Sequence, residues 1–146
     1  AGAFICAESH NSDGTFTPSY SDFVVGNTDA AVDNGWQRVS TTFKVPENSS
    51  KTRINLALKQ STGTVYFDGI QLESYTVANN YNMLENSGFE KYSSNGLPTS
   101  WYDGYSTLNN AIDCKSEAQK KGKYSFRINK KHRHRKPPTQ IKKKAK

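Results

Sequence analysis

The sequence has few of the residues that mark several common protein classes. It contains one methionine and two cysteines in 146 residues, and no Cys-x-x-Cys pair occurs. Structural zinc sites usually include such a pair, so we expect none here. Spacing alone leaves open whether Cys6 and Cys114 form a disulfide or are small buried residues. No run approaches the roughly 18 apolar residues of a membrane-spanning helix, and we expect no membrane insertion.

Short catalytic motifs are also missing. The chain has no Gly-x-Ser-x-Gly elbow, no His-Glu-x-x-His pair, no phosphate-binding loop and no cysteine next to a histidine. Two carboxylates hydrolyse a glycosidic bond only at a defined separation across a cleft, which 13 scattered acidic residues do not establish. We therefore expect a protein that is not an enzyme.

The positive charge of the chain is concentrated at one end. The formal net charge is +7, from 20 basic and 13 acidic residues. Nine of the basic residues and none of the acidic ones lie in residues 130–146, which leaves 11 basic against 13 acidic side chains elsewhere. A nucleic-acid-binding fold usually carries its basic patch on the folded body, so we expect no specific nucleic-acid partner.

Residues 129–146 form a basic tail. Its apolar residues are Ile141 and Ala145, and it contains Pro137-Pro138. Such a segment buries too little apolar surface to offset the entropy of ordering the chain, so we expect it to be disordered. It is either a foreign extension, from expression or a shifted reading frame, or a natural polybasic segment. A natural segment would bind anionic surfaces with a strong salt dependence.

The plentiful residues are Ser, Thr, Asn, Gly, Tyr, Phe and Val, which favour strands joined by polar turns. The clearest predicted strand is residues 34–46, whose inward side chains would be Trp36, Val39, Thr41, Phe43 and Val45. Further strands are predicted at residues 3–8, 51–60 and 65–73, and Asp13-Gly14 indicates a hairpin turn. Short strands separated by turns every 8–12 residues or so are typical of a β-sandwich or barrel.

Four phrases occur in a particular order. GWQRVSTTFKVP, residues 35–46, precedes TGTVYFDGIQLE, residues 62–73. After a polar linker come NMLENSGFE, residues 82–90, and GKYSFRI, residues 122–128. Together they resemble the carbohydrate-binding-module-like jelly-roll domains found with YD-repeat (RHS-type) cell-wall-associated proteins of Gram-positive bacteria. The first two phrases resemble the end of one module, and the last two resemble the beginning of the next.

The resemblance implies a division of the chain into three parts. Residues 1–78 would be the C-terminal half of a jelly-roll module, residues 79–128 the N-terminal part of a following module, and residues 129–146 the disordered tail. Family strands before residue 1 and after residue 128 are missing. Because a jelly roll's first and last strands lie close together, the second part can complete the first. We expect an all-β, jelly-roll-like antiparallel β-sandwich, either circularly permuted in a monomer or completed by strand exchange in a domain-swapped dimer.

The resemblance also implies a function. It implies a non-catalytic module of a secreted or cell-surface bacterial protein, with a glycan or cell-wall polysaccharide as its partner. The candidate sugar-binding residues lie in the stretch WYDGY and are Trp101, Tyr102, Asp103 and Tyr105. Aromatic rings stack on sugars, and binding residues concentrate on the loops of rigid sandwiches. Further candidates, if their sheet face is exposed, are Tyr20, Asn27, Gln60 and Tyr66.

Other interpretations of these residues stay open. Trp36 and Trp101 also suit core packing, and the tyrosines also suit an ordinary polar turn with partly buried rings. The chain would then be a structural spacer or a protein-interaction module without a sugar ligand.

The resemblance finally implies a structural calcium ion. Modules of this family often hold one between the closing and the opening strand. Asp68 in FDG and Glu90 in GFE stand in the matching phrases and are the candidate ligands. Family members commonly show a second acid after the first, where this chain has Gly69. Calcium takes six to eight oxygen ligands, so two carboxylates are equally consistent with two solvated acids at strand ends.

Overall fold

The fold consists of β-strands. The computed structural model describes residues 2–24, 35–74, 81–104, 115–116, 119–130 and 139–145. Within these ranges there is no α-helix, and hence no helix long and apolar enough to cross a membrane. The strands are β1 (Gly2–Asn11), β2 (Phe16–Tyr20), β3 (Ser49–Lys59), β4 (Gly63–Phe67), β5 (Tyr102–Asp103), β6 (Lys115–Ser116), β7 (Ser125–Lys130) and β8 (Thr139–Ala145). The predicted all-β class is confirmed.

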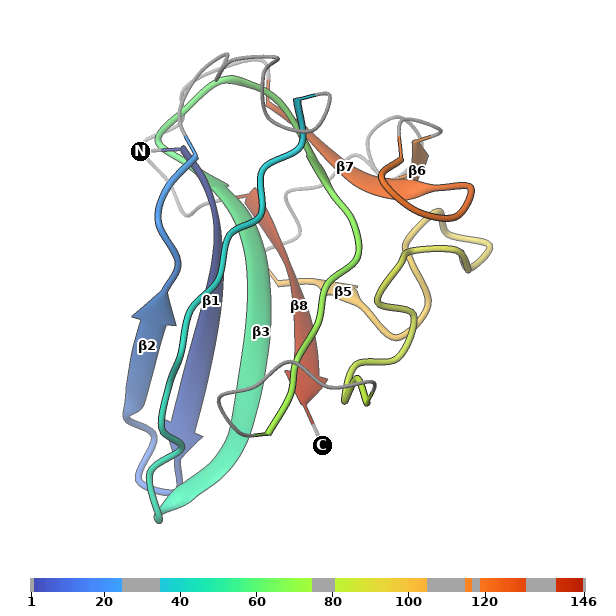
Figure 1. The fold of residues 1–146 in the computed structure, drawn as a ribbon. Coiled ribbons are helices and arrows are strands. Elements are labelled where there is room, and N and C mark those ends of the chain that lie inside the picture. The colour runs from blue at the N-terminus through green and yellow to red at the C-terminus, as the bar shows by residue number, and fades with distance from the viewer. Residues whose placement is uncertain are drawn as a thin grey trace.

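The strands form two antiparallel sheets, as in a β-sandwich (Figure 1). The large sheet has the order β2-β1-β3-β8-β5, and the small sheet has the order β4-β7-β6. Each sheet combines strands from residues 1–78 with strands from the later part of the chain. The chain thus pairs its own early and late strands within both sheets, while the jelly-roll connectivity stays a prediction.

The hairpin between β1 and β2 follows the predicted turn. The two strands pair from Cys6 opposite Tyr20 to His10 opposite Phe16. The Asp13 carboxylate accepts the backbone N–H of Thr15 at 2.9 Å and also the Thr15 hydroxyl, and these bonds lower the pKa of Asp13. Gly14 adopts a φ of 86°, which costs glycine little.

The core lies between the two sheets. Ile54, Leu56 and Leu58 alternate along β3 and are 4%, 0% and 5% exposed, as their spacing predicts. They pack against buried residues of the small sheet and of the segment 81–101. The largest of these are Phe67, Phe89, Trp101, Phe126 and Ile128.

The end of the chain corrects one expectation. Disorder was expected for all of residues 129–146, but Thr139–Ala145 forms strand β8 between β3 and β5. The pairing runs from Leu58 opposite Thr139 to Thr52 opposite Ala145. β3 offers a free edge whose backbone groups need partners, and Ile141 buries its whole side chain in the core. Composition missed this strand because backbone pairing with β3 and burial of Ile141 order it, and overall composition reports neither.

The segment 36–46 differs from the predicted structure. A strand was predicted there, but among the described residues no backbone ladder joins it to a neighbour. The predicted alternation holds for Val39, Thr41 and Phe43, which are half-buried between exposed neighbours, whereas Val45 is 50% exposed. The chain is therefore extended and packed by one face without being hydrogen-bonded into a sheet. Side-chain periodicity reports which face is buried and does not report whether a partner strand is present.

Candidate functional site

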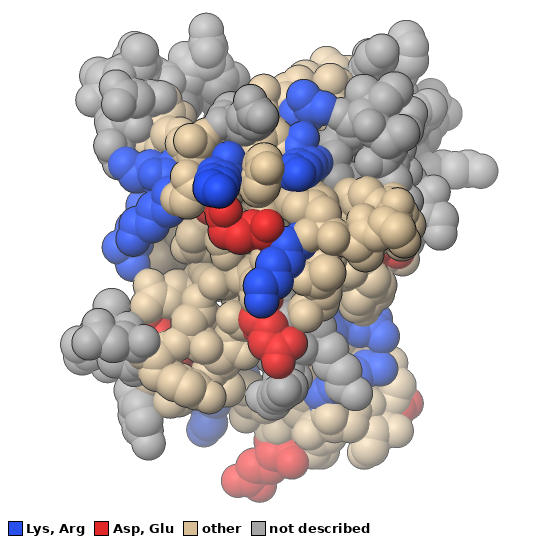
Figure 2. All heavy atoms as spheres, turned by 90° about the vertical axis from the view of Figure 1, so that its right-hand side faces the viewer, with Lys and Arg blue, Asp and Glu red and all other residues tan. Residues whose placement is uncertain are grey.

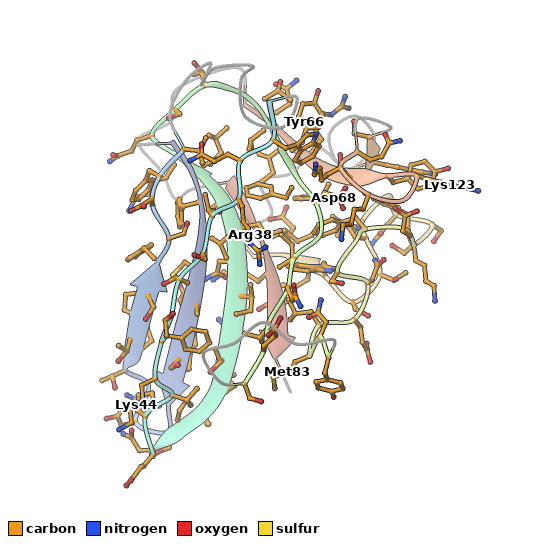
Figure 3. The ribbon with its side chains drawn as sticks, in the orientation of Figure 1. Arg38, Lys44, Tyr66, Asp68, Met83 and Lys123 are labelled. Carbon is orange, nitrogen blue, oxygen red and sulfur yellow. The ribbon has the colours of Figure 1, made fainter. Side chains whose placement is uncertain are left out.

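A groove lies on the inner face of the large sheet. It runs between the segments 36–43 and 66–72, which follow separate paths in front of that sheet (Figure 3). Its volume is about 440 Å³, and its floor includes Ile5, Ala7 and Ile54 from β1 and β3. Among the described residues, no backbone hydrogen bond joins the two segments.

The walls of the groove combine aromatic and polar side chains. One wall carries Trp36, Arg38 and Phe43, and the other carries Tyr66, Asp68 and Gln71, with Lys120 and Lys121 beside it. Tyr66 is 38% exposed, and Trp36 is partly buried. A concave surface with an apolar floor and a few polar groups on its walls is the usual form of a small-molecule site.

The Asp68 carboxylate binds backbone amides next to the groove. Its Oδ2 accepts the N–H groups of Lys120 at 2.7 Å and Lys121 at 2.8 Å, and its Oδ1 accepts the N–H of Gly69 at 2.7 Å. Asp68 follows β4, whereas the two lysines begin the loop that leads into β7. The carboxylate therefore fixes this loop against the end of the small sheet.

Glu90 binds the same loop two residues further on. Its Oε1 accepts the N–H groups of Lys123 at 2.9 Å and Tyr124 at 3.1 Å, and Oε2 accepts the Lys123 N–H at 3.0 Å. Between the two sets of amides lies Gly122, with a φ of 71°. A Cβ atom there would lie 2.1 Å from Glu90 Oε1, so the close approach requires glycine. Figure 2 shows this side of the molecule, where acidic side chains lie at the centre with basic ones close on either side.

The structure thus brings the two predicted calcium ligands, Asp68 and Glu90, to one loop. Their oxygens face backbone N–H groups, which offer positive ends of dipoles where a calcium site needs further oxygen ligands. Among the described residues no group of three or more acidic, histidine or cysteine side chains is placed to hold a metal. The arrangement favours a carboxylate–amide clasp, in which Asp68 and Glu90 bind backbone N–H groups within residues 120–124. Because Asp68 belongs to residues 1–78 and Glu90 to residues 79–128, the clasp joins the loop to both of these parts. The calcium site that the resemblance implies is tested by the substitution described next.

The clasp has a measurable consequence. Replacing Asp68 with Ala leaves three N–H groups without their acceptor, and we expect the free energy of unfolding to fall by about 1–3 kcal/mol. Because these amides already occupy both oxygens of the carboxylate, we expect the loss to be the same with calcium and with a chelator. Urea unfolding under both conditions measures it. A wild-type chain that calcium stabilises, beside a variant that calcium does not affect, would instead establish the metal site.

The candidate sugar-binding residues at 101–105 are separated by the fold. Trp101 is 5% exposed, its ring lies 5.1 Å from that of Phe89, and its Nε1 donates to the carbonyl of Asn86 at 3.2 Å. Its ring is part of the core and has no free face for a sugar. Tyr102 is 40% exposed on β5 and Asp103 is partly buried, and neither lines the groove. Tyr105 lies outside the described residues.

Cys6 is a free thiol on the opposite face of β1. It is 1% exposed, and its pKa is raised to about 11, chiefly by burial and then by the charge of Glu8. The thiol therefore stays protonated and unreactive at neutral pH. Cys114, whose pairing with Cys6 the sequence left open, lies outside the described residues.

Sequence reasoning found some of the groove residues and missed others. Tyr66 was one of four sheet-face candidates; of the other three, Tyr20 and Gln60 do not line the groove, and Asn27 lies outside the described residues. Trp36 was expected to be buried in the core. Arg38 and Gln71 gave no signal beyond being the polar members of alternating stretches. Their role depends on two segments separating in space, which a one-dimensional pattern does not encode.

Comparisons of this chain with protein-family models, with curated proteins and with solved structures found no significant match.

Proposed function

We propose that this chain is a non-catalytic carbohydrate-binding module that holds a glycan in the groove between the segments 36–43 and 66–72. The observation that carries the proposal is the pairing of Trp36 and Tyr66 with polar side chains around one concavity of about 440 Å³. This volume lies within the range of roughly 300–1,000 Å³ that is usual for ligand pockets. The resemblance of the four sequence phrases supports the same function and a place in a secreted or cell-surface bacterial protein.

Each part of the groove has a task in this proposal. Tyr66 presents an exposed ring on which the apolar face of a sugar can stack. Arg38 and Gln71 supply hydrogen bonds to hydroxyl groups from the two walls. The β1 and β3 floor holds the walls at a fixed depth, so the protein loses little conformational entropy when the ligand binds.

A protein-interaction module is the second candidate. The edge strand β2 and the residues after it carry three exposed aromatic side chains, Phe16 at 55%, Tyr20 at 49% and Phe23 at 40%. Exposed aromatic clusters are common in protein interfaces. In this case the groove would bind no sugar, and the module would act as a spacer between the neighbouring modules of its parent protein.

Aromatic substitutions separate the two candidates. We expect Tyr66→Ala to weaken binding of an oligosaccharide about tenfold, because a lost stacking contact of about 1.4 kcal/mol corresponds to that factor. Tyr81→Ala is the matched control, since Tyr81 is 70% exposed and does not line the groove. Calorimetric titration against an oligosaccharide panel measures both. If Tyr66→Ala binds the oligosaccharide as the wild type does and Tyr102→Ala does not bind it, the site lies at β5. If the wild-type chain binds no oligosaccharide of the panel, the protein-interaction module is favoured.

A further inference from the structure

The groove carries an excess of positive charge. Its charged lining residues are Arg38, Lys120 and Lys121 against the single acid Asp68. The Asp68 carboxylate already accepts three backbone N–H groups, so much of its hydrogen-bonding capacity is taken up. A neutral sugar gives no reason for three cations around one site.

This charge is local to the groove. Outside residues 130–146 the chain has 11 basic and 13 acidic side chains, a slight acidic excess. Three of those 11 basic residues line this one concavity. Arg38 and Lys121 are exposed, and among the described residues neither forms an ion pair. A ligand in the groove therefore meets Arg38 and Lys121, neither of which has a paired carboxylate among the described residues.

The cations stand on both sides of the groove. Arg38 projects from the segment that crosses the large sheet, and Figure 3 shows Tyr66 and Asp68 on the facing segment. Asp68 binds the backbone of Lys120 and Lys121, which places the bases of these side chains at that facing wall. A guanidinium binds a carboxylate or phosphate through two parallel hydrogen bonds, and an ammonium group acts as a point charge.

We infer that the groove binds an acidic glycan, with its carboxylate or phosphate groups between Arg38 and Lys121 and a sugar ring on Tyr66. This inference rests on the proposed carbohydrate-binding function and names the chemical class of its ligand. Uronic acids and phosphodiester-linked sugars share the required chemistry, which is a saccharide with a repeated negative charge.

A matched pair of ligands tests the inference. The probe is a linear hexagalacturonate, and its control is the same oligosaccharide with its carboxyl groups reduced to alcohols. We expect the acidic form to bind the full-length chain at least tenfold more tightly in 50 mM salt, with the preference falling as salt is raised. A phosphodiester-linked oligosaccharide of similar charge forms a second arm, which tells whether carboxylate or phosphate is preferred.

Charge substitutions locate the binding. Arg38→Ala and Lys121→Ala should each reduce the preference for the acidic form severalfold. Lys44→Ala and Lys123→Ala are the matched controls, because both lysines are exposed, lie six and two residues after the test positions and do not line the groove (Figure 3). We expect these controls to bind as the wild type does.

Each outcome has a defined meaning. Equal binding of the acidic and the reduced oligosaccharide, with sensitivity to Tyr66→Ala, would overturn the inference and leave the proposed function standing. An acidic preference unchanged by Arg38→Ala and Lys121→Ala would also overturn the inference, because the basic C-terminal residues would then hold the ligand. Failure of all three oligosaccharides to bind would overturn the inference and remove the support for the proposed function.

Discussion

A chain that ends at residue 138 should lose the cooperative unfolding transition of the full-length protein. The deletion removes β8, which lies between β3 and β5 and provides the cross-strand partners of seven β3 residues. It also exposes the side of the core that Ile141 covers. The large sheet would be left with β3 as an edge strand paired only with β1, and the β3 backbone groups that β8 had satisfied must be solvated again. Far-ultraviolet circular dichroism during urea unfolding measures the loss.

A graded pair of substitutions tests the same strand without removing it. Ile141 is fully buried, so we expect Ile141→Ala to lower the free energy of unfolding by about 2–5 kcal/mol and Ile141→Val by about 0.5–1.5 kcal/mol. Unchanged stability in Ile141→Ala and in the deletion would mean that β8 does not belong to the folded core. The deletion also bears on binding experiments, because any loss of polyanion binding that it causes would report unfolding as well as lost lysines.

Trp101→Ala should be strongly destabilising, because its ring belongs to the core. The Trp101 ring packs against Phe89, and Phe89 in turn lies 5.6 Å from Phe126 of β7. The indole Nε1 also donates to the Asn86 carbonyl, and this bond holds the two ends of the segment 86–101 together. Truncating a buried aromatic side chain costs about 3–5 kcal/mol, and we expect a value in this range.

The neighbouring residue supplies the control for this prediction. Tyr102 follows Trp101 directly and is 40% exposed, so Tyr102→Ala should change the free energy of unfolding by less than about 1 kcal/mol. Thermal or urea unfolding of both variants gives the comparison. A Trp101→Ala variant with wild-type stability and lost glycan binding would contradict the core role and restore Trp101 as a sugar-binding residue.

Several features of this protein follow from its sequence alone. The alternation of Ile54, Leu56 and Leu58 with polar residues predicts β3, its inward face and its contribution to the core. The Asp13-Gly14 pair predicts the β1–β2 hairpin, because the aspartate side chain and the glycine backbone satisfy the turn locally. These features depend on neighbours within a few residues, and the chain encodes them directly.

Other features were decided by tertiary structure. Strand β8 exists because β3 had an edge to pair with, and the segment 36–46 is no strand because no described segment lies in register beside it. The groove has its walls from two segments that are separate in sequence, and Asp68 and Glu90 meet one loop only after distant parts of the chain have packed together. Pairing and packing join residues far apart in sequence, so periodicity determined which faces are buried and the fold determined what those faces meet.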